Sequence, residues 1–245
     1  MNQVMQTMLQ HSSVRRFTEQ SIEAELLADI VCCGQAASSS SFIQAYSVVR
    51  VSDEQKRITI ARAAGNQRWV VQAAEFMVVC ADMQRIQYAC NKHQAGALEG
   101  YTEHFMTATI DAALMAQNML LAAESAGLGG VFIGGIRNDP QSVADCLQLP
   151  ELVYPVFGLC LGWPAEHYAI KPRLPTSAVM HQDRYDLAAI ENQVDAYDQL
   201  MSEYYKNRDA NSKQSSWSEQ TANAVQGKKR EHMLSFLQQR GFLKR

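Results

Sequence analysis

The sequence predicts a globular protein of mixed α-helices and β-strands, and three observations lead to this prediction. The 245 residues are 47% apolar and 19% charged, enough apolar material for a sizeable core and too apolar for disorder. Short apolar runs at 47–51, 75–81 and 153–162 are typical of strands. The run at 107–126, rich in Ala, Leu and Met, contains no helix breaker and predicts a buried helix.

Two helices are expected before the first strand. Apolar residues at helical spacing predict one that ends near His11 and another from 21 to 34. Ser21 is a suitable N-cap for the second, and Gly34 ends it. A further helix of about ten residues is expected between the first two strands.

Strands, loops and helices are also expected to alternate in the second half of the chain. Residues 127–135 form a glycine-rich strand region, and residues 139–140, Asp-Pro, then cap and begin a helix. The prolines of 164–175 predict a stiffened loop. Helices are expected over 187–208 and 217–240.

The apolar helix at 107–126 needs cover on more than one side. Burial in the core and burial at a subunit interface both provide it. Its length of about 30 Å favours the interface.

The charge balance limits the possible partners. A formal charge of −3 gives no electrostatic case for nucleic acid, and no apolar run is long enough to cross a membrane. The first residues lack a signal-like stretch, so a cytoplasmic protein is expected. The six cysteines could form disulfides, but free thiols are favoured, and no spacing suggests a metal site.

The last eighteen residues carry a cluster of basic side chains with a single acid, Glu231. A solvated helix face and an anion-attracting rim over an active site both account for it. The basic residues are Lys228, Lys229, Arg230, Arg240, Lys244 and Arg245.

Several common catalytic motifs are absent. Gly127, Gly129 and Gly130 begin like a dinucleotide fingerprint, but Phe132 stands where the third glycine belongs. The sequence also has no P-loop, no G-x-S-x-G and no H-E-x-x-H. These absences count against classical NAD-domain, ATPase, hydrolase and zinc-protease functions.

What remains is a set of basic, amide and hydroxyl groups in expected loops. Guanidinium and ammonium groups joined by hydroxyls suit a phosphate. Each residue alone is also typical of an ordinary surface, and spacing alone does not bring them together. The set comprises His11, Ser13 and Arg15, then Ser39, Gln67, Lys171 and Arg173.

Ordered sequence blocks across the whole chain carry a family resemblance. They are HSSVR near the start, SSSSF before the first strand, GNQ at 65–67, MAQN at 115–118, AAESAGLGGVFIGGIRN at 122–138, FGLCLGWP at 157–164 and KPRLP at 171–175. A final block is the YY…R…WS segment of 204–218. With these blocks the sequence resembles the oxygen-insensitive NADPH nitroreductases and NADPH–flavin oxidoreductases of the FMN-dependent nitroreductase superfamily.

The resemblance implies an α+β fold in which a mostly antiparallel sheet is flanked by helices. It also implies an intertwined homodimer with two FMN sites at the interface. Residues 1–245 would then be a single FMN-binding domain whose C-terminal helical excursion, about 187–245, embraces the partner.

The resemblance further implies which residues bind FMN. They are His11, Ser12, Ser13, Val14, Arg15, Ser39, Gln67, Phe132, Ile133, Gly134, Gly135, Lys171 and Arg173. The glycines would let backbone N–H groups approach the flavin ring, although a tight strand crossing also accounts for them.

No catalytic side chain is needed in this reading, because the flavin carries the chemistry. Arg15 and Lys171 are expected to stabilise the negative charge that builds on the reduced flavin. His11 is expected to position FMN, with an acid–base role as the alternative.

The NADPH and acceptor sites follow from the same resemblance. Arg208 would bind the 2′-phosphate of NADPH with help from Lys213, where the family often has two arginines. This departure removes a charge and a bidentate fork, so a weaker preference for NADPH is the alternative. Ser40, Ser41, Phe42 and Arg230 are expected at the acceptor site.

The implied activity is ping-pong hydride transfer from NADPH to FMN and then two-electron reduction of nitroaromatics, quinones or free flavin. Two alternatives stay open. One is a flavin reductase that supplies reduced FMN to a partner, and the other is a flavin-binding protein without turnover.

Overall fold

The computed structural model describes residues 1–206, 215–227 and 230–245. The chain divides into two compact units. The first comprises Met1–Tyr168 together with Arg230–Arg245, and the second is Ala169–Lys229.

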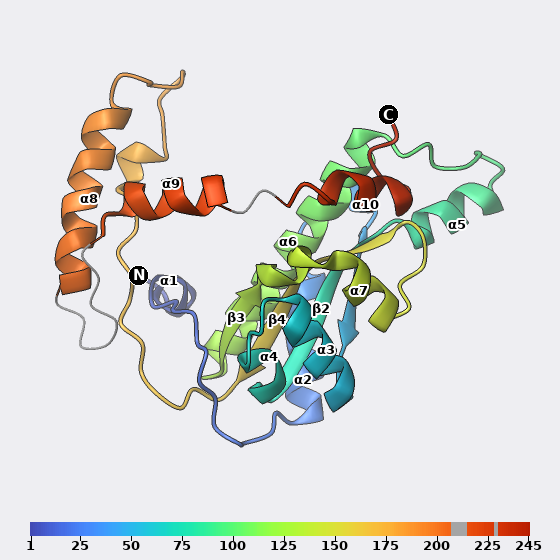
Figure 1. The fold of residues 1–245 in the computed structure, drawn as a ribbon, viewed down its shortest axis with the longest axis horizontal. Helices are drawn as coiled ribbons and strands as arrows, with labels where there is room; N and C mark the ends of the chain where they lie inside the picture. The colour runs from blue at the N-terminus through green and yellow to red at the C-terminus, as the bar shows by residue number, and fades with distance from the viewer. Residues whose placement is uncertain (207–214, 228–229) are drawn as a thin grey trace. The chain divides into compact units, whose positions relative to one another are not determined.

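The first unit holds the four strands and most of the helices (Figure 1). In chain order its elements are α1 Gln3–Leu9, α2 Ala24–Gln35, η1 Ser40–Phe42, β1 Tyr46–Arg50, α3 Glu54–Ala63, α4 Trp69–Gln72, β2 Glu75–Asp82, α5 Gln84–Lys92, α6 Thr102–Ser125, β3 Gly129–Ile133, η2 Gly134–Asn138, α7 Pro140–Cys146, β4 Val153–Gly162 and α10 Met233–Gln239. The second unit contributes η3 Thr176–Ala178, α8 Ile190–Lys206 and α9 Trp217–Gly227.

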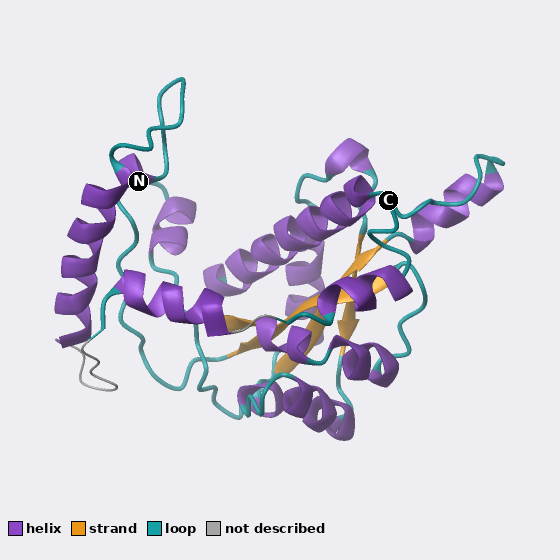
Figure 2. Ribbon diagram, turned by 45° about the horizontal axis from the view of Figure 1, so that its top comes forward, coloured by secondary structure: helices purple, strands orange, loops and turns teal. Residues whose placement is uncertain are grey.

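The strands form an antiparallel sheet in the order β1-β2-β4-β3, with helices on both faces (Figure 2). Side chains of β2 alternate between the two faces, as a strand covered on both sides requires. Met77 and Val79 pack in the core that includes α2 and α6. Phe76 and Val78 pack in the core formed with α3, α4 and α7. The α+β fold expected from the resemblance is therefore confirmed.

The central strand pair contains a bulge. Val79 lies opposite Phe157 and Cys80 lies opposite Pro155, so the register shifts at this point and skips Val156. Proline has no amide hydrogen for a sheet ladder, and a bulge is one of the few places where a sheet accepts it.

Local sequence signals located several elements closely. The predicted strand at 153–162 matches β4, and Asp139 caps α7 by accepting a hydrogen bond from the Ser142 amide. The expected N-cap at Ser21 is wrong, because α2 begins at Ala24. The Ser21 carbonyl, which an N-cap would offer to the first turn of the helix, instead accepts a hydrogen bond from the Trp163 indole N–H at 3.1 Å.

The predicted helix at 217–240 is two helices. The first, α9, ends at Gly227, and α10 begins at Met233. Between them Arg230 has a φ of 45°, a left-handed conformation that an α-helix cannot contain.

The long helix α6 has two apolar faces. Its inner face, with Met115, Met119 and Leu120, is buried in the core. On its outer face Ile110 and Leu114 are about half exposed. The predicted apolar helix is confirmed, and it leaves an unpartnered apolar surface on the single chain.

The chain returns to the first unit at its C-terminal end. Phe236, Leu237 and Phe242 are buried in the core around α6. Arg240 donates hydrogen bonds to the carbonyls of Leu149, Pro150 and Val153. This member of the basic cluster is therefore part of the fold rather than of an anion-attracting rim.

The structure also bears on the state of the cysteines and on membrane-crossing helices. All six cysteines are free thiols, as favoured. Among the described residues, no helix has the length and apolar content that a membrane crossing requires.

The second unit has a small core of its own. Tyr197, Met201 and Tyr205 of α8 are buried together, with Trp217 of α9 packed against them. The Asp198 carboxylate accepts a hydrogen bond from the Ser218 amide at 2.8 Å, which ties the start of α9 to α8.

Candidate functional site

The loop His11–Arg15 lies against the start of β3. The Val14 amide donates to the Gly130 carbonyl at 3.0 Å, and Ser13 forms a parallel bridge with Gly130. A Cβ on Gly129 would lie 2.4 Å from the Val14 side chain, so glycine is needed for this close approach. Val14 is buried, whereas Arg15 is exposed.

Two side chains outside the loop hold it in place. His11 Nδ1 lies 2.5 Å from Glu124 Oε1 on α6, and both side chains are largely buried. The Tyr168 hydroxyl oxygen accepts hydrogen bonds from the amides of Arg15 and Arg16, at 3.3 and 3.0 Å. Burial is the largest cause that raises the pKa of Tyr168, so the hydroxyl stays neutral at ordinary pH.

Gln67 follows a tight turn in which Gly65 and Asn66 have φ values of 84° and 60°. Its Nε2 donates to the Ala64 carbonyl at 2.9 Å, and its Oε1 accepts from the Trp69 indole at 3.0 Å. A Cβ on Gly135 would lie 2.3 Å from Gln67 Nε2 and 2.4 Å from the Ala64 oxygen. The backbone at Gly135 is therefore packed directly on this amide.

Trp69 joins this turn to the first loop. The Arg15 guanidinium carbon lies 5.8 Å from the centre of the Trp69 ring, within range of a cation–π contact. Arg15, Gln67 and Gly135 thus belong to one connected cluster, which we call the Arg15–Gln67 cluster.

The end of β3 contributes the remaining residues of the predicted glycine-rich segment. Ile133 is fully buried, and Phe132 packs edge-on against Phe157 at 5.0 Å between ring centres. Gly134 begins η2, where a Cβ would lie 3.2 Å from the Arg137 guanidinium.

The loop Ser39–Ala45 carries Ser39 and the predicted acceptor residues. Ser41, Phe42 and Gln44 all have positive φ values, between 47° and 57°. Phe42 is 81% exposed. Such a run of left-handed non-glycine residues is costly, so the surrounding structure must hold it.

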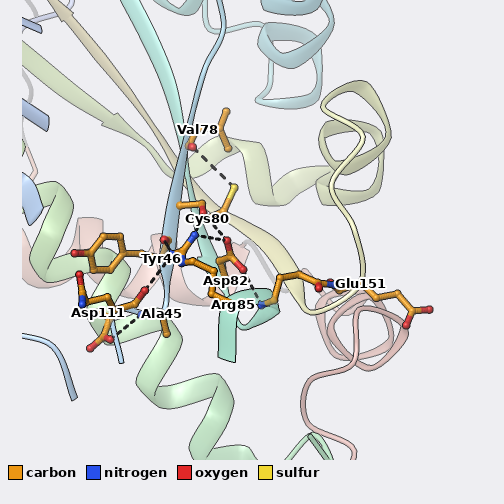
Figure 3. Close-up of polar contacts among 11 residues, drawn as sticks. Ala45, Tyr46, Val78, Cys80, Asp82, Arg85, Asp111 and Glu151 are labelled. Atoms are coloured by element: carbon orange, nitrogen blue, oxygen red, sulfur yellow. Dashed lines mark hydrogen bonds and ion pairs between the residues drawn. The ribbon is translucent and has the colours of Figure 1, made fainter. Parts of the chain in front are cut away.

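Asp111 of α6 is the main support of this loop. Its carboxylate accepts hydrogen bonds from the amides of Ser40, at 2.9 Å, and Ala45, at 3.1 Å, and the residue is 1% exposed. Figure 3 shows this carboxylate reaching the main chain at Ala45. From α5, Arg85 donates to the Gln44 carbonyl at 3.1 Å. It also pairs with Asp82 at 3.3 Å (Figure 3).

Arg230, the last predicted acceptor residue, lies beside η2. Its Nε donates to Asn138 Oδ1 at 3.0 Å. Burial, and next the Arg230 charge, lower the pKa of Arg137, whose guanidinium donates to the Val156 carbonyl at 2.7 Å. Two guanidinium groups therefore lie near the end of β3.

Four predicted residues are not placed in this arrangement. Lys171 and Arg173 belong to the second unit, where the Lys171 ammonium lies 5.5 Å from the Tyr205 ring centre. Arg208 and Lys213 lie outside the described residues.

Two pockets lie near parts of the site without coinciding with it. One of about 700 Å³ runs along β1 between α2 and α5, and none of the predicted site residues lines it. Another of about 470 Å³ is lined in part by Arg62, Gly65 and Asn138, beside the turn that leads to Gln67.

Asp111, Glu124, Trp69 and Tyr168 were not among the predicted residues. A signal was present for Asp111, because it is the single charged residue between 107 and 123. A carboxylate in so apolar a helix must have buried partners. Trp69 and Tyr168 offered no comparable signal, since their contacts depend on the fold.

Comparison with known proteins identifies the class. The model of the nitroreductase family matches residues 8–163, and that of the nitroreductase family C-terminal domain matches 171–245. The chain belongs to the nitroreductase family, as the resemblance implied.

Particular relatives span its whole length. The chain is 43% identical to the NADPH-flavin oxidoreductase of Vibrio harveyi and 42% identical to the FMN reductase (NADPH) of Bacillus subtilis (strain 168), with 100% of each chain covered in both cases. Among solved structures, nitroreductase A from Vibrio parahaemolyticus RIMD 2210633 superposes with a TM-score of 0.91 at 44% identity, with both chains fully covered.

Proposed function

We propose that this protein is an FMN-dependent oxidoreductase that uses NADPH to reduce nitroaromatics, quinones or free flavin. Full-length relatives named NADPH-flavin oxidoreductase and FMN reductase (NADPH) support the proposal. The observation that carries it is the Arg15–Gln67 cluster, in which Trp69 contacts both the Arg15 cation and the Gln67 amide, and the amide packs on the Gly135 backbone.

The residues present suit FMN. At Gly135 a Cβ would collide with the Gln67 amide and the Ala64 carbonyl, so only glycine lets the proposed flavin-binding backbone lie directly against the Gln67 amide. No described carboxylate pairs with Arg15, which leaves its charge available for an anion. The proposed FMN ligands are those predicted from the sequence, including Lys171 and Arg173 of the second unit.

The chain's own groups bind and stabilise rather than react. When bound, FMN supplies hydride transfer from NADPH and two-electron delivery to the acceptor. Arg15, with Lys171, stabilises negative charge at the pyrimidine edge. Glu124 orients the His11 ring, which supports the positioning role of His11.

The acceptor site is proposed at the loop Ser39–Ala45, with Arg230 as a further contact. Exposed Ser40, Ser41 and Phe42 leave this surface open to a planar aromatic acceptor. We assign the 2′-phosphate of NADPH to Arg208 and Lys213 on the family resemblance alone.

We further propose that the protein is a homodimer with residues 1–245 acting as one FMN-binding domain. The exposed apolar face of α6 supports this, because Met106, Ile110 and Leu114 would otherwise face water. Four apolar side chains of α1 are also half exposed or more: Val4, Met5, Met8 and Leu9. A cytoplasmic location remains part of the proposal.

A single experiment tests the activity. The purified protein should carry about one FMN per chain, released by heat and identified by chromatography, and NADPH should bleach the bound flavin without oxygen. Adding a nitroaromatic should then restore the absorbance. Absence of flavin after reconstitution, or flavin that NADPH does not reduce, would refute the proposed function.

A further inference from the structure

Trp69 contacts both polar residues of the Arg15–Gln67 cluster, and no sequence signal pointed to it. We propose that Trp69 is a positioning residue for the flavin site, because one indole ring both fixes the Gln67 amide and supports the Arg15 guanidinium. The inference rests on the proposed function, and it assigns Trp69 no contact with the reacting atoms.

The Gln67 amide is held at both ends. Gln67 Oε1 accepts from Trp69 Nε1 at 3.0 Å, and Gln67 Nε2 donates to the Ala64 carbonyl at 2.9 Å. An amide held at both ends cannot exchange its oxygen and nitrogen without losing both bonds. One acceptor lone pair on Oε1 and one hydrogen on Nε2 remain for a ligand.

The free lone pair on Gln67 Oε1 and the free hydrogen on Gln67 Nε2 suit a flavin. The pyrimidine edge of the ring presents an N–H donor beside carbonyl acceptors, so it is complementary to an acceptor and a donor side by side. With its ends exchanged, the Gln67 amide would face like groups of a ring bound in the same place. The indole N–H therefore selects one alignment of the ring against the amide.

The Trp69 ring also supports the Arg15 guanidinium. Arg15 is exposed, and its guanidinium carbon lies 5.8 Å from the Trp69 ring centre. A carboxylate in that position would hold the side chain but cancel its charge. The π face holds it and leaves the charge for an anionic ligand.

The main chain of Trp69 is held by two hydrogen bonds. The Trp69 carbonyl accepts from the Ala73 amide at 3.0 Å and from the Cys160 thiol at 3.6 Å on β4. Phenylalanine would keep the π face without the donor, and leucine would keep neither. These two substitutions therefore separate the two contacts.

FMN binding to apoprotein, followed by flavin fluorescence quenching, tests the inference. Trp69→Phe should weaken binding about fivefold, the effect of losing one hydrogen bond. In a Gln67→Ala background the same change should cost less than about twofold, because the amide is no longer there. Trp69→Leu should weaken binding about threefold more than Trp69→Phe.

Trp163→Phe is the matched control, since Trp163 also donates one indole hydrogen bond, to the Ser21 carbonyl at 3.1 Å. It should leave FMN affinity unchanged. Equal losses from Trp69→Phe in both backgrounds would overturn the inference and give Trp69 a purely structural role. Wild-type apoprotein that fails to bind FMN would instead refute the proposed function.

A second measurement does not depend on the folding of any Trp69 variant. The chain has three tryptophans, so its ¹⁵N-labelled apoprotein should show three indole N–H resonances. Gln67→Ala should shift one of them, and FMN should shift the same one in the wild type. If Gln67→Ala leaves all three resonances in place, the proposed contact is wrong.

Discussion

The turn at Gly65–Trp69 and the loop Ser39–Ala45 both carry predicted site residues, but they are held by different means. In the turn, one glycine and one asparagine, Gly65 and Asn66, take the left-handed positions, and neighbouring groups hold the amide of Gln67. In the loop, three non-glycine residues are left-handed, and a carboxylate on a distant helix holds the main chain. The turn is thus supported locally, whereas the loop depends on α6.

The loop should be the more fragile of the two. Asp111→Asn removes one acceptor and faces an amide N–H with another donor, so a buried group loses its partner. We expect a loss of about 3 kcal/mol in the free energy of unfolding, measured with urea. Asp29→Asn, at an exposed site on α2, should change it by less than about 0.5 kcal/mol. Equal values for the two variants would show that Asp111 does not hold the loop.

The second-largest loss of stability is expected at the turn Gly65–Trp69. Gly135→Ala places a methyl group 2.3 Å from Gln67 Nε2 and 2.4 Å from a backbone oxygen. We expect a loss of about 2 kcal/mol in stability and FMN binding weaker by about tenfold. Gly227→Ala is the control, because a Cβ there would meet no atom of the described residues within 4 Å. Full FMN affinity in Gly135→Ala would contradict the assignment of this backbone to the flavin site.

A smaller loss of stability is expected at the loop His11–Arg15, which is also held by a carboxylate of α6. Glu124→Gln replaces the charged partner of His11 with a neutral amide, and we expect a loss of about 1 kcal/mol. Calorimetric unfolding would measure it. Glu166→Gln breaks the exposed ion pair with Arg16 and should have almost no effect. If Glu166→Gln lost more stability than Glu124→Gln, the His11–Glu124 pair would not be the more important of the two.

The smallest change in stability is expected at the tip of the loop. Phe42→Ala should leave the free energy of unfolding within about 0.5 kcal/mol, because the ring is 81% exposed. Steady-state kinetics should show KM for a nitroaromatic raised about threefold with KM for NADPH unchanged. Tyr88→Ala, exposed on α5, provides the comparison. Unaltered KM for every acceptor would remove Phe42 from the acceptor site.

The sequence was informative wherever a structural signal is local. Asp139 and Pro140 located the start of α7, and the continuous apolar run located β4. Ser21 failed as a cap because Trp163, distant in sequence, binds its carbonyl. The break before α10 had a local signal in Gly227, where α9 ends, and the prediction of a single helix over 217–240 did not use it.

The same distinction applies to the candidate site. His11–Arg15 and Gln67 were predicted from short sequence blocks, without knowledge of their neighbours. Asp111, Glu124 and Trp69 act through contacts that only the folded chain creates. The charged residue in an apolar helix was the one long-range support that composition could have revealed.

Pro155 in the middle of β4 has a consequence for how the chain finds its fold. Antiparallel strands rich in Val, Leu and Phe can slide past one another with little loss of apolar contact. A proline in such a strand permits few alignments, because it must avoid every position that needs an amide donor. The bulge at Val79 and Cys80 is where this chain accommodates it. We therefore expect Pro155 to act as an alignment mark for β2 and β4, one that excludes shifted pairings during folding.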